Sequence, residues 1–425
     1  MTAQGILDST TTPQTPSRRR SGPRRPGRPA PGRTRHTFQT RPALSFEPAA
    51  HDQTPVDFAV LPLDDRLKLG VSDRGFAQTT PIQSAVFPTV LDGTDLIACA
   101  QTGTGKTAAF LLPIMHRLLT RPRPAGEPAR TRVLVLAPTR ELAVQIEDDF
   151  QGFAYHTALT GVAVYGGVGA DPQARALRAG VDVVIATPGR LQDHLNCGVA
   201  DLGAVEVLVI DEADRMLDMG FWPDVRRIVA SLPVERQTLL FSATMSDEVV
   251  TLARQIMRAP TFVQVGPAGG PANTITHLTH VLPTQDKVDW LAGFLRRVDG
   301  PALVFVRTKR GADRLSTKLA ARGIRCAALH ADRTQEQRTA AIEGFRGGRF
   351  KVLVATDIAA RGLDIDGIGH VINFEVPATH DAYVHRVGRT GRAEATGTAL
   401  TLAGHEEVAA LQLLGKSIEL QTLSA

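Results

Sequence analysis

Short apolar runs alternate with longer amphipathic stretches along most of the chain. An apolar run of four to six residues predicts a buried strand, and a 3.6-residue period between such runs predicts a helix. In the first half, the predicted strands are Leu96–Cys99, Arg132–Ala137, Val162–Tyr165, Val181–Ala186, Val207–Ile210 and Thr238–Phe241. This alternation is typical of βαβ units, which build a parallel sheet with helices on both faces.

The same rhythm returns after a cluster of glycine and proline that has no periodicity, and this cluster predicts a linker over residues 266–275. The later strands are predicted near Leu278–Leu282, Ala302–Val306, Cys326–Leu329, Val352–Ala355, His370–Asn373 and Thr398–Leu402, with one closing helix after the last. We therefore predict an α/β fold of two tandem domains, residues 47–265 and 276–425.

Composition agrees with two globular domains. The chain has 425 residues, of which 43% are hydrophobic and 21% charged, enough for two separate cores. No run of eighteen apolar residues occurs, so a membrane span is not expected. The three cysteines are far apart and lack CxxC spacing, which argues against a disulfide framework or a zinc site. A reducing, cytoplasmic location fits this cysteine usage.

The N-terminal residues 1–46 form a separate, basic segment. They hold nine arginines, no lysine and a single acid, Asp8, whereas the whole chain carries +5. Arg, Pro, Gly, Ser and Thr dominate this segment, and such a composition predicts disorder. We interpret it as an interaction arm for a polyanion such as nucleic acid, with a solubilising tail as the alternative. An organellar transit peptide is disfavoured, because seven prolines oppose the amphipathic helix it needs.

A glycine-rich loop follows the first predicted strand and precedes a helical run that starts at Ala108. Its sequence, Ala100-Gln-Thr-Gly-Thr-Gly-Lys-Thr107, is that of a phosphate-binding loop, with Ala100 where the general pattern has glycine. Gly103 and Gly105 let backbone N–H groups turn towards phosphate, and Lys106 adds a positive charge. The Thr107 hydroxyl is a candidate ligand for Mg²⁺.

Acidic residues follow the strand Val207–Ile210 directly, as Asp211-Glu-Ala-Asp214. At a strand tip, Asp211 is placed to hold Mg²⁺ through water, and Glu212 is placed to orient or activate the attacking water. Alone, these four residues would equally suit a solvated helix start. The preceding strand and the phosphate-binding loop favour the catalytic interpretation.

With these motifs in this order, the sequence resembles the DEAD-box RNA helicases of superfamily 2 over roughly residues 58–403. The resemblance implies two RecA-like domains, RNA-stimulated ATP hydrolysis and ATP as the nucleotide. It also implies that Gln83, in Thr80-Pro-Ile-Gln83, reads adenine and that Phe58 stacks on it. Thr79 stands where the family usually has proline, and we expect this change to loosen the loop. The implied nucleotide contacts in the loop are Thr102, Gly103, Thr104, Gly105, Lys106 and Thr107.

The resemblance also assigns RNA contacts and coupling residues in the first domain. Its motifs place Arg140, Gly167, Thr187 and Arg190 on the sugar–phosphate backbone, each just after a predicted strand. The hydroxyls of Ser242 and Thr244 are expected to bond Asp214 and to sense the γ-phosphate. Taken singly, each of these residues would also serve as a turn or cap. Aromatic residues are only 5% of the chain, so base stacking is not expected to dominate.

In the second domain, the resemblance implies that Thr356 and Gly362 meet RNA and that Asp364 meets the ribose. Ala331 stands where the family has glycine, and its methyl group argues against a close approach to the backbone at this position. The segment His385–Arg392 holds three arginines, although its domain has no phosphate-binding loop. We therefore expect these arginines to face the nucleotide of the first domain. Arg389 and Arg392 match the family's arginine fingers, and His385 its coupling histidine.

These features predict an ATP-dependent RNA helicase that opens short duplexes or remodels RNA–protein complexes without processive movement. Neither domain holds a whole site, so ATP and RNA should favour one closed state together. Two alternatives remain at this point: a DNA-directed translocase of the same superfamily, and an ATP-gated RNA clamp that seldom turns over.

Overall fold

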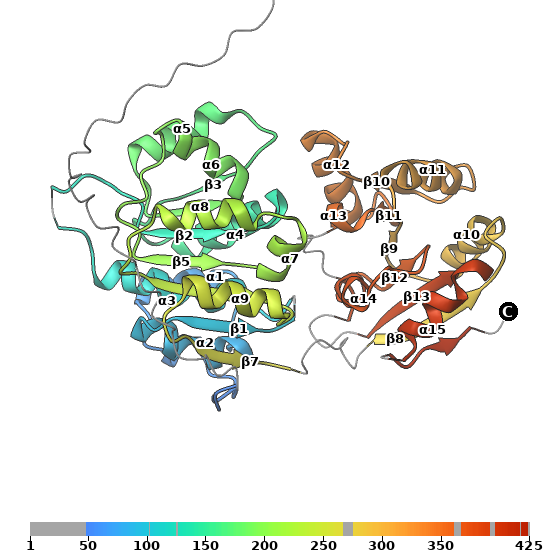
Figure 1. The fold of residues 1–425 in the computed structure, drawn as a ribbon, viewed down its shortest axis with the longest axis horizontal. Coiled ribbons are helices and arrows are strands. Elements are labelled where there is room, and N and C mark those ends of the chain that lie inside the picture. Colours follow the sequence, from blue (N-terminus) through green and yellow to red (C-terminus); the bar gives the residue numbers. More distant parts are fainter. Residues whose placement is uncertain are drawn as a thin grey trace, which may run out of the picture. The chain divides into compact units, whose positions relative to one another are not determined.

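The computed structural model describes residues 48–101, 103–124, 126–266, 275–360, 367–391, 396–416 and 418–423 (Figure 1). Within them lie two seven-stranded sheets in which every pair of neighbouring strands is parallel. The predicted fold, two tandem RecA-like α/β domains, is confirmed. The predicted tail 1–46 lies outside the described residues, as does most of the predicted linker.

The first domain alternates strands with helices as the sequence pattern predicts. Its strands are β1 (Leu96–Cys99), β2 (Val133–Leu136), β3 (Gly161–Val164), β4 (Val183–Ala186), β5 (Val207–Ile210), β6 (Gln237–Ser242) and β7 (Thr261–Gln264). Its helices are η1 (Phe58–Val60), α1 (Asp65–Asp73), α2 (Pro81–Asp92), α3 (Lys106–Thr120), α4 (Arg140–Ala154), α5 (Ala170–Ala179), α6 (Pro188–Asn196), α7 (Ala213–Asp218), α8 (Trp222–Ala230) and α9 (Asp247–Ile256).

The second domain follows the same plan. Its strands are β8 (Ile275–Val281), β9 (Ala302–Phe305), β10 (Cys326–Leu329), β11 (Val352–Ala355), β12 (His370–Asn373), β13 (Gly397–Ala403) and β14 (Gln421–Thr422). Its helices are α10 (Lys287–Arg297), α11 (Lys309–Ala320), α12 (Gln335–Arg346), α13 (Asp357–Ala360), α14 (His380–Val387), η2 (His405–Glu407) and α15 (Val408–Leu414).

The two sheets have one topology. The strand order is β3-β4-β2-β5-β6-β1-β7 in the first sheet and β10-β11-β9-β12-β13-β8-β14 in the second. Counted from the first strand of each domain, these orders are identical. Sequence analysis did not predict the last strand of each domain, because β7 and β14 are short and lack a strong apolar run. The chain therefore does not end on the predicted closing helix, since β14 follows α15.

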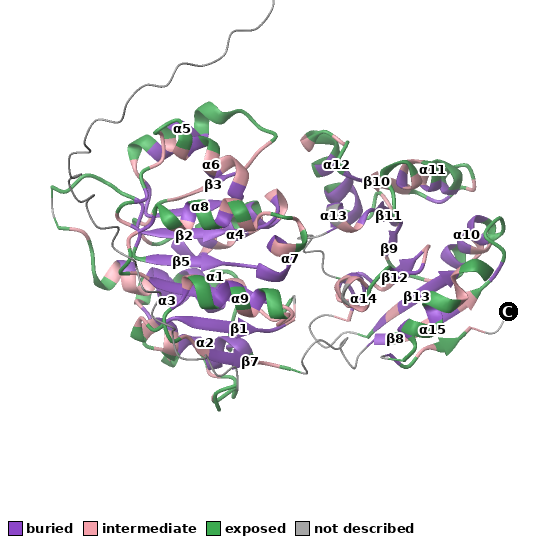
Figure 2. Ribbon diagram, viewed as in Figure 1, coloured by how far each residue is buried: buried purple, intermediate pink, exposed green. Residues whose placement is uncertain are grey.

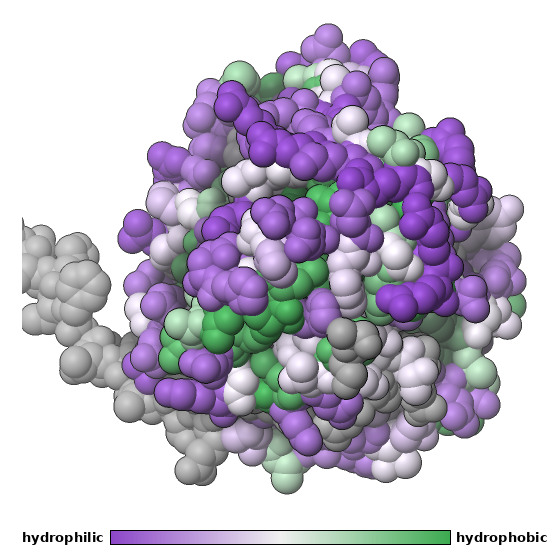
Figure 3. Space-filling view, turned by 90° about the vertical axis from the view of Figure 1, so that its right-hand side faces the viewer, coloured by the Kyte–Doolittle hydropathy of each residue, from purple (hydrophilic) through white to green (hydrophobic). Residues whose placement is uncertain are grey.

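Burial follows the layers of each domain. The central strands are buried, and the covering helices are buried on one side and exposed on the other (Figure 2). Figure 3, which looks at the right-hand side of Figure 1, shows mostly hydrophilic residues around a smaller hydrophobic group. Among the residues described, no helix is both long and apolar enough to cross a membrane.

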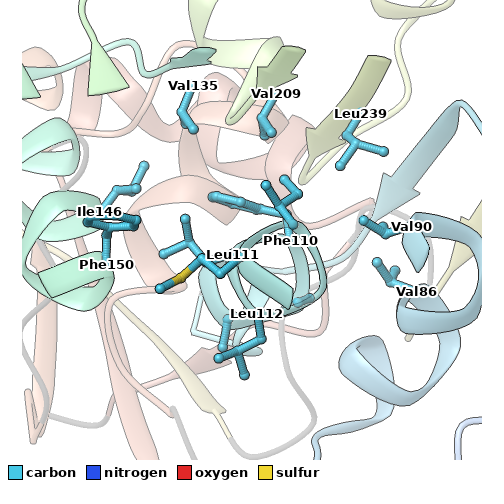
Figure 4. Close-up of a cluster of buried hydrophobic side chains, with 14 of the residues drawn as sticks. Val86, Val90, Phe110, Leu111, Leu112, Val135, Ile146, Phe150, Val209 and Leu239 are labelled. Carbon is cyan, nitrogen blue, oxygen red and sulfur yellow. The ribbon is translucent and has the colours of Figure 1, made fainter. Parts of the chain in front are cut away.

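The first sheet separates two hydrophobic cores. One lies under α1 to α4 and includes Phe110, which packs against Phe241 with ring centroids 5.3 Å apart. Figure 4 shows side chains of this core, with Val86 and Val90 from α2, Phe110 from α3 and Phe150 from α4 turned towards strand residues. The other core lies under α5 to α9. These two layers fix the loops at the carboxyl ends of the strands.

The second sheet is covered in the same way. Residues of α10 and α11 pack in one core, and residues of α12, α13 and α14 pack in the other. Figure 1 shows α11 and α12 on opposite sides of β10, the strand at the sheet's edge.

Candidate nucleotide and nucleic-acid site

The glycine-rich loop connects β1 to α3 with the backbone that phosphate binding requires. Gly103 and Gly105 have φ values of +82° and +88°, a region that side chains rarely adopt. Gly105 is also the N-cap of α3, so the first N–H groups of the helix point into the loop. The helix begins at Lys106, two residues before the predicted start. A helix N-terminus behind such a loop favours an anion.

Lys106 is 7% exposed, and its ammonium donates to the carbonyls of Ala100 (2.6 Å) and Gln101 (3.1 Å). Burial lowers the pKa of Lys106, while the nearby charges of Asp211, Glu212 and Asp214 oppose that change. The structure therefore brings the loop lysine and the acids after β5 together, although 105 positions separate Lys106 from Asp211.

Asp211 and Glu212 are both buried, at 2% and 7% exposure. Burial, and then the charge of Glu212, raise the pKa of Asp211 above its ordinary value, while Lys106 counteracts them. Glu212 has a φ of +52°, one of two non-glycine residues with positive φ among those described. Such a backbone costs energy and is common at functional sites. Two buried carboxylates with one lysine form a region that a divalent cation would neutralise.

Sequence analysis missed Arg215, which pairs with the candidate catalytic base. Its Nη1 donates to Glu212 Oε2 at 2.5 Å, and the two side chains are 2% and 9% exposed. Glu212 is the N-cap of α7 and Arg215 lies in the first turn of that helix, so the two groups meet at the start of α7. Spacing alone was a weak signal, since the same spacing occurs on solvated helices. Arg215 thus holds the Glu212 carboxylate in place.

Asp214 connects three parts of the site. Its Oδ2 accepts from the backbone N–H of Ala243 (3.1 Å) and of Thr244 (3.0 Å), and from the Thr244 hydroxyl (3.0 Å). His385 of the second domain lies 3.7 Å from the same oxygen. Burial favours the protonated acid, but His385, Arg215 and Lys106 outweigh it, and the pKa of Asp214 is lowered.

The predicted contact of Ser242 with Asp214 is not present. The Ser242 hydroxyl donates instead to the carbonyl oxygen of Thr244, at 2.7 Å. Ser242 is the last residue of β6 and is fully buried, so its side chain closes the turn that presents Thr244.

On the candidate adenine side, Gln83 connects its loop to the phosphate loop. Its Nε2 donates to the Gly105 carbonyl (3.1 Å), and its Oε1 accepts from the N–H of Thr80 (2.9 Å). Phe58 is 3% exposed and packs against Phe76 and Phe87, with ring centroids 6.4 Å away in both cases. The side chain of Gln83 therefore lies at the start of α3, and Phe58 lies against the loop that precedes α2.

Our expectation that Thr79 loosens this loop is wrong. Thr79 is 3% exposed, and its hydroxyl accepts from the N–H of Val56 (2.8 Å) and bonds Ser84 Oγ (2.7 Å). Its own N–H donates to the Val56 carbonyl at 2.8 Å. Proline has no N–H for this bond. Threonine therefore holds the loop in place through its hydroxyl and N–H hydrogen bonds.

The predicted RNA contacts of the first domain share the edge formed by strand carboxyl ends. Arg140 begins α4, and its guanidinium lies against Gly167, which has a φ of +83°. Arg190 donates from both terminal nitrogens to the Val168 carbonyl, each at 3.2 Å. Thr187 is the N-cap residue of α6, three positions before Arg190. The four residues thus lie after β2, β3 and β4, which are neighbours in the sheet.

The second domain divides its arginines between structure and chemistry. Arg386 binds Asp357 with two bonds (2.5 and 2.7 Å) and Asn373 with a third (2.9 Å), which gives it a structural role. Arg389 is 3% exposed and lines a small cavity together with Arg215 and His385. Thr356 follows β11 and is 8% exposed. The predicted residues Thr102, Gly362, Asp364 and Arg392 lie outside the described part of the chain.

A second ion pair joins the two domains, and sequence analysis did not predict it. Arg338 of α12 donates from Nε (2.9 Å) and Nη2 (2.6 Å) to Glu141 Oε1 of α4. The side chains are 10% and 12% exposed. Glu141 directly follows the predicted RNA contact Arg140, so this pair ties the RNA edge of the first domain to the second.

Comparison with known proteins gives the same picture at the level of families. The family model described as DEAD/DEAH box helicase matches residues 80–252, and the helicase conserved C-terminal domain matches residues 286–394. DEAD-box ATP-dependent RNA helicase 30 of Arabidopsis thaliana is 45% identical over 345 residues, which are 80% of this chain and 58% of that protein. ATP-dependent RNA helicase CshA of Listeria monocytogenes is 41% identical over 359 residues, 84% of this chain and 68% of that protein.

Solved structures resemble the whole two-domain body. Dbp5 of S. cerevisiae bound to RNA and ADP BeF3 has a TM-score of 0.77 and 31% identity, covering 86% of this chain and 95% of that one. Mss116p bound to ssRNA and AMP-PNP has a TM-score of 0.78 and 26% identity, covering 89% of this chain and 82% of that one. The chain spans little more than half the length of the Arabidopsis relative.

Proposed function

This chain belongs to the DEAD/DEAH box helicase family, and on that premise we propose that it is an ATP-dependent RNA helicase with an ATP site shared between its domains. One observation carries the proposal. The phosphate-binding loop, the acids after β5 and two groups of the second domain, His385 and Arg389, converge on one buried region. The first domain binds the nucleotide, and the second completes the site for hydrolysis.

Within this site each residue has a separate task. The loop N–H groups and Lys106 hold the phosphates, as the helix N-terminus and the positive charge favour. Glu212, held by Arg215, takes the proton of the attacking water. Arg389 neutralises charge on the phosphoryl group in transfer, and Arg392 is proposed as a second such group. Gln83 and Phe58 recognise adenine, and Asp364 the ribose.

We propose Thr107 and Asp211 as the protein ligands of Mg²⁺. When bound, the ion would neutralise charge on the phosphates and on the buried carboxylates. The part of the chain that the structure describes holds no group of three or more His, Cys, Asp or Glu side chains placed to bind a metal. Mg²⁺ in such a site is bound through one or two protein ligands, together with phosphate and water.

The RNA path in this proposal follows the strand carboxyl ends of both domains, through Arg140, Gly167, Thr187 and Arg190 and then Thr356 and Gly362. Threonine, arginine and backbone N–H groups contact sugar and phosphate, so the core has little sequence preference. Disrupting one base step costs about 1.4 kcal/mol on a DNA scale. One closure of the two domains therefore opens a few base pairs, and hydrolysis resets the protein.

We also propose that the chain works in the cytoplasm and that residues 1–46 are an auxiliary RNA arm. The first proposal rests on Cys99, Cys197 and Cys326, which are all free thiols and suit a reducing compartment. The second rests on the nine arginines of that segment.

Glu212→Gln in the full chain tests the proposal. Without the base, ATP turnover in the presence of a single-stranded RNA should fall by about 10²–10⁴-fold while ATP and RNA still bind. Glu235→Gln, an exposed acid paired with Arg258, is the matched control and should keep parental turnover. Glu212→Gln turning over at the parental rate would remove Glu212 as the base. Equal stimulation of the parental chain by DNA of the same sequence would favour a DNA-directed translocase.

A further inference from the structure

The charge of the folded body is unevenly distributed between and within the domains. Residues 47–265 hold 19 Lys or Arg and 26 Asp or Glu, whereas residues 276–425 hold 20 and 16. Within the second domain, residues 307–351 alone hold twelve basic and four acidic residues, a net charge of +8. The average charge of the body hides this basic segment, which comprises α11, β10 and α12.

Three of these cations lie in a row on the outer side of α11. Ala312, Leu315 and Leu319 are buried against the sheet and so fix which side of the helix faces solvent. Arg310, Arg314 and Lys318 recur every four residues and are all exposed. At 1.5 Å per residue the row is about 12 Å long. We call these three residues the α11 row.

The α11 row differs from the cations around it. Those neighbours are engaged in ion pairs: Lys309 with Asp332, Arg322 with Asp289, Arg333 with Asp313 and Arg338 with Glu141. In the described structure, Arg310, Arg314 and Lys318 form no such pair. Asp289 feels the charge of Lys318, but its carboxylate already bonds Arg322. Three exposed like charges are thus left side by side on one helix, an arrangement that is destabilising unless an anion neutralises it.

The α11 row starts beside the proposed RNA path and leads away from it. Arg310 is five residues beyond Phe305, the last residue of β9. Phe305 pairs in register with Ala355, the residue before the proposed RNA contact Thr356. Because α11 runs back along the sheet, Lys318 lies further from that edge than Arg310. A strand that turns from this edge along α11 would meet the row lengthwise.

The chemistry of this surface favours a nucleic-acid backbone over a protein. Protein interfaces need apolar or aromatic anchors at their centre. None of the exposed large hydrophobic residues lies between residues 307 and 351 in the described structure. Exposed Arg and Lys without apolar neighbours suit phosphates, which are closely spaced along an RNA strand.

We propose that the α11 row binds the phosphate backbone of RNA that extends beyond the core path. This inference rests on the proposed RNA-helicase function and adds a second contact surface to it. The row holds the flanking part of a long RNA next to the site where the core opens it. It contributes affinity without sequence preference and is not needed for ATP hydrolysis.

The test compares two RNAs on the full chain. One is a short single strand that fills only the core, and the other is the same strand joined to a longer flank. The variant Arg310→Gln/Arg314→Gln/Lys318→Gln removes the row. A matched control, Arg121→Gln/Arg130→Gln/Arg226→Gln, removes three exposed arginines of the first domain. Thermal unfolding checks that both variants remain folded, as exposed positions predict.

We expect the row variant to bind the flanked RNA about 10- to 100-fold more weakly at low salt. Its plot of log affinity against log salt should become flatter by about 2, since each phosphate contact contributes about 0.7. Affinity for the short strand, and turnover saturated with it, should change less than about twofold. Deleting residues 1–46 should weaken binding independently, so that the two losses multiply.

Three results would overturn the inference. The row variant could keep parental affinity and salt slope for the flanked RNA. It could lose as much affinity for the short strand, which would put the row inside the core path. The control variant could lose the same affinity, which would show that the loss depends on the net charge of the protein and not on the position of the row. If short RNA fails to stimulate ATP turnover in the parental chain, the proposed function fails instead, and that outcome is separate from these three.

Discussion

Lys106 and Lys287 occupy the same place in two copies of one topology. Each is the first residue of the helix that follows the first strand of its sheet, and each is buried, at 7% and 1% exposure. Their surroundings differ. Lys106 lies among three acids and a glycine-rich loop, whereas Lys287 donates to Glu407 (2.7 Å) and to the carbonyls of Phe374 and Leu402 (3.1 Å each).

The loops explain that difference. Residues 100–105 include two glycines with positive φ, while the corresponding residues 282–286 of the second domain include none. After the fifth strand of each sheet stand Asp211 in the first domain and Phe374 in the second. The fold alone therefore does not make a nucleotide site. We expect a few loop residues to make one copy the nucleotide site, and we expect the lysine of the other copy to stabilise its domain.

Substituting each lysine in turn should separate these two roles. Lys106→Ala should abolish ATP turnover and leave the fold intact, because its charge serves the phosphates. Lys287→Met should leave Glu407 without its buried partner and lower the free energy of unfolding by about 3–5 kcal/mol. Turnover per folded molecule should then stay near the parental rate. Urea unfolding and ATPase assays on the same samples measure both effects.

The lysine comparison has an internal control. Adding Glu407→Gln to Lys287→Met removes the carboxylate charge that lost its buried partner, although Arg307 also lies 3.4 Å from it, and should recover part of the lost stability. A folded Lys287→Met chain without turnover would show that the second lysine also serves the nucleotide.

Arg386 of α14 and Arg389 in the turn after it allow the same comparison between two residues of one short segment. Arg389→Ala should slow hydrolysis by about 10³–10⁵-fold and leave ATP affinity within several-fold. Arg386→Ala should act on stability, because it removes the two bonds to Asp357 and the bond to Asn373. Single-turnover hydrolysis and thermal unfolding distinguish the two. Normal hydrolysis in a folded Arg389→Ala chain would show that another residue neutralises the charge on the transferred phosphoryl group.

Sequence patterns predicted what is local. Strand runs, the loop at 100–107 and the acids after β5 can each be recognised within a few residues, and the structure brings Lys106 close to Asp211 as parallel strands require. The pairs Arg215–Glu212 and Arg338–Glu141 were not predicted, because they depend on how buried side chains pack. Arg386 looked equivalent to Arg389 by spacing, and only its bonds to Asp357 reveal a structural role.

Two other failures have simple physical causes. Thr79 was judged by what proline would do, whereas its hydroxyl and N–H form bonds that proline lacks. The α11 row cannot be seen in the net charge, because the two domains have charges of opposite sign. Charge acts over about 8–10 Å at ordinary salt, so its local distribution decides binding.

The central claim is that one ATP site is shared between two domains that also share the RNA path. It is tested most directly by linkage in the Glu212→Gln chain, which should hold ATP without hydrolysing it. RNA should raise the affinity for ATP, and ATP should raise the affinity for RNA, by one common factor of about 5–150. Adding Arg389→Ala should reduce that factor towards one. Affinities for ATP and RNA that do not depend on each other would contradict the account.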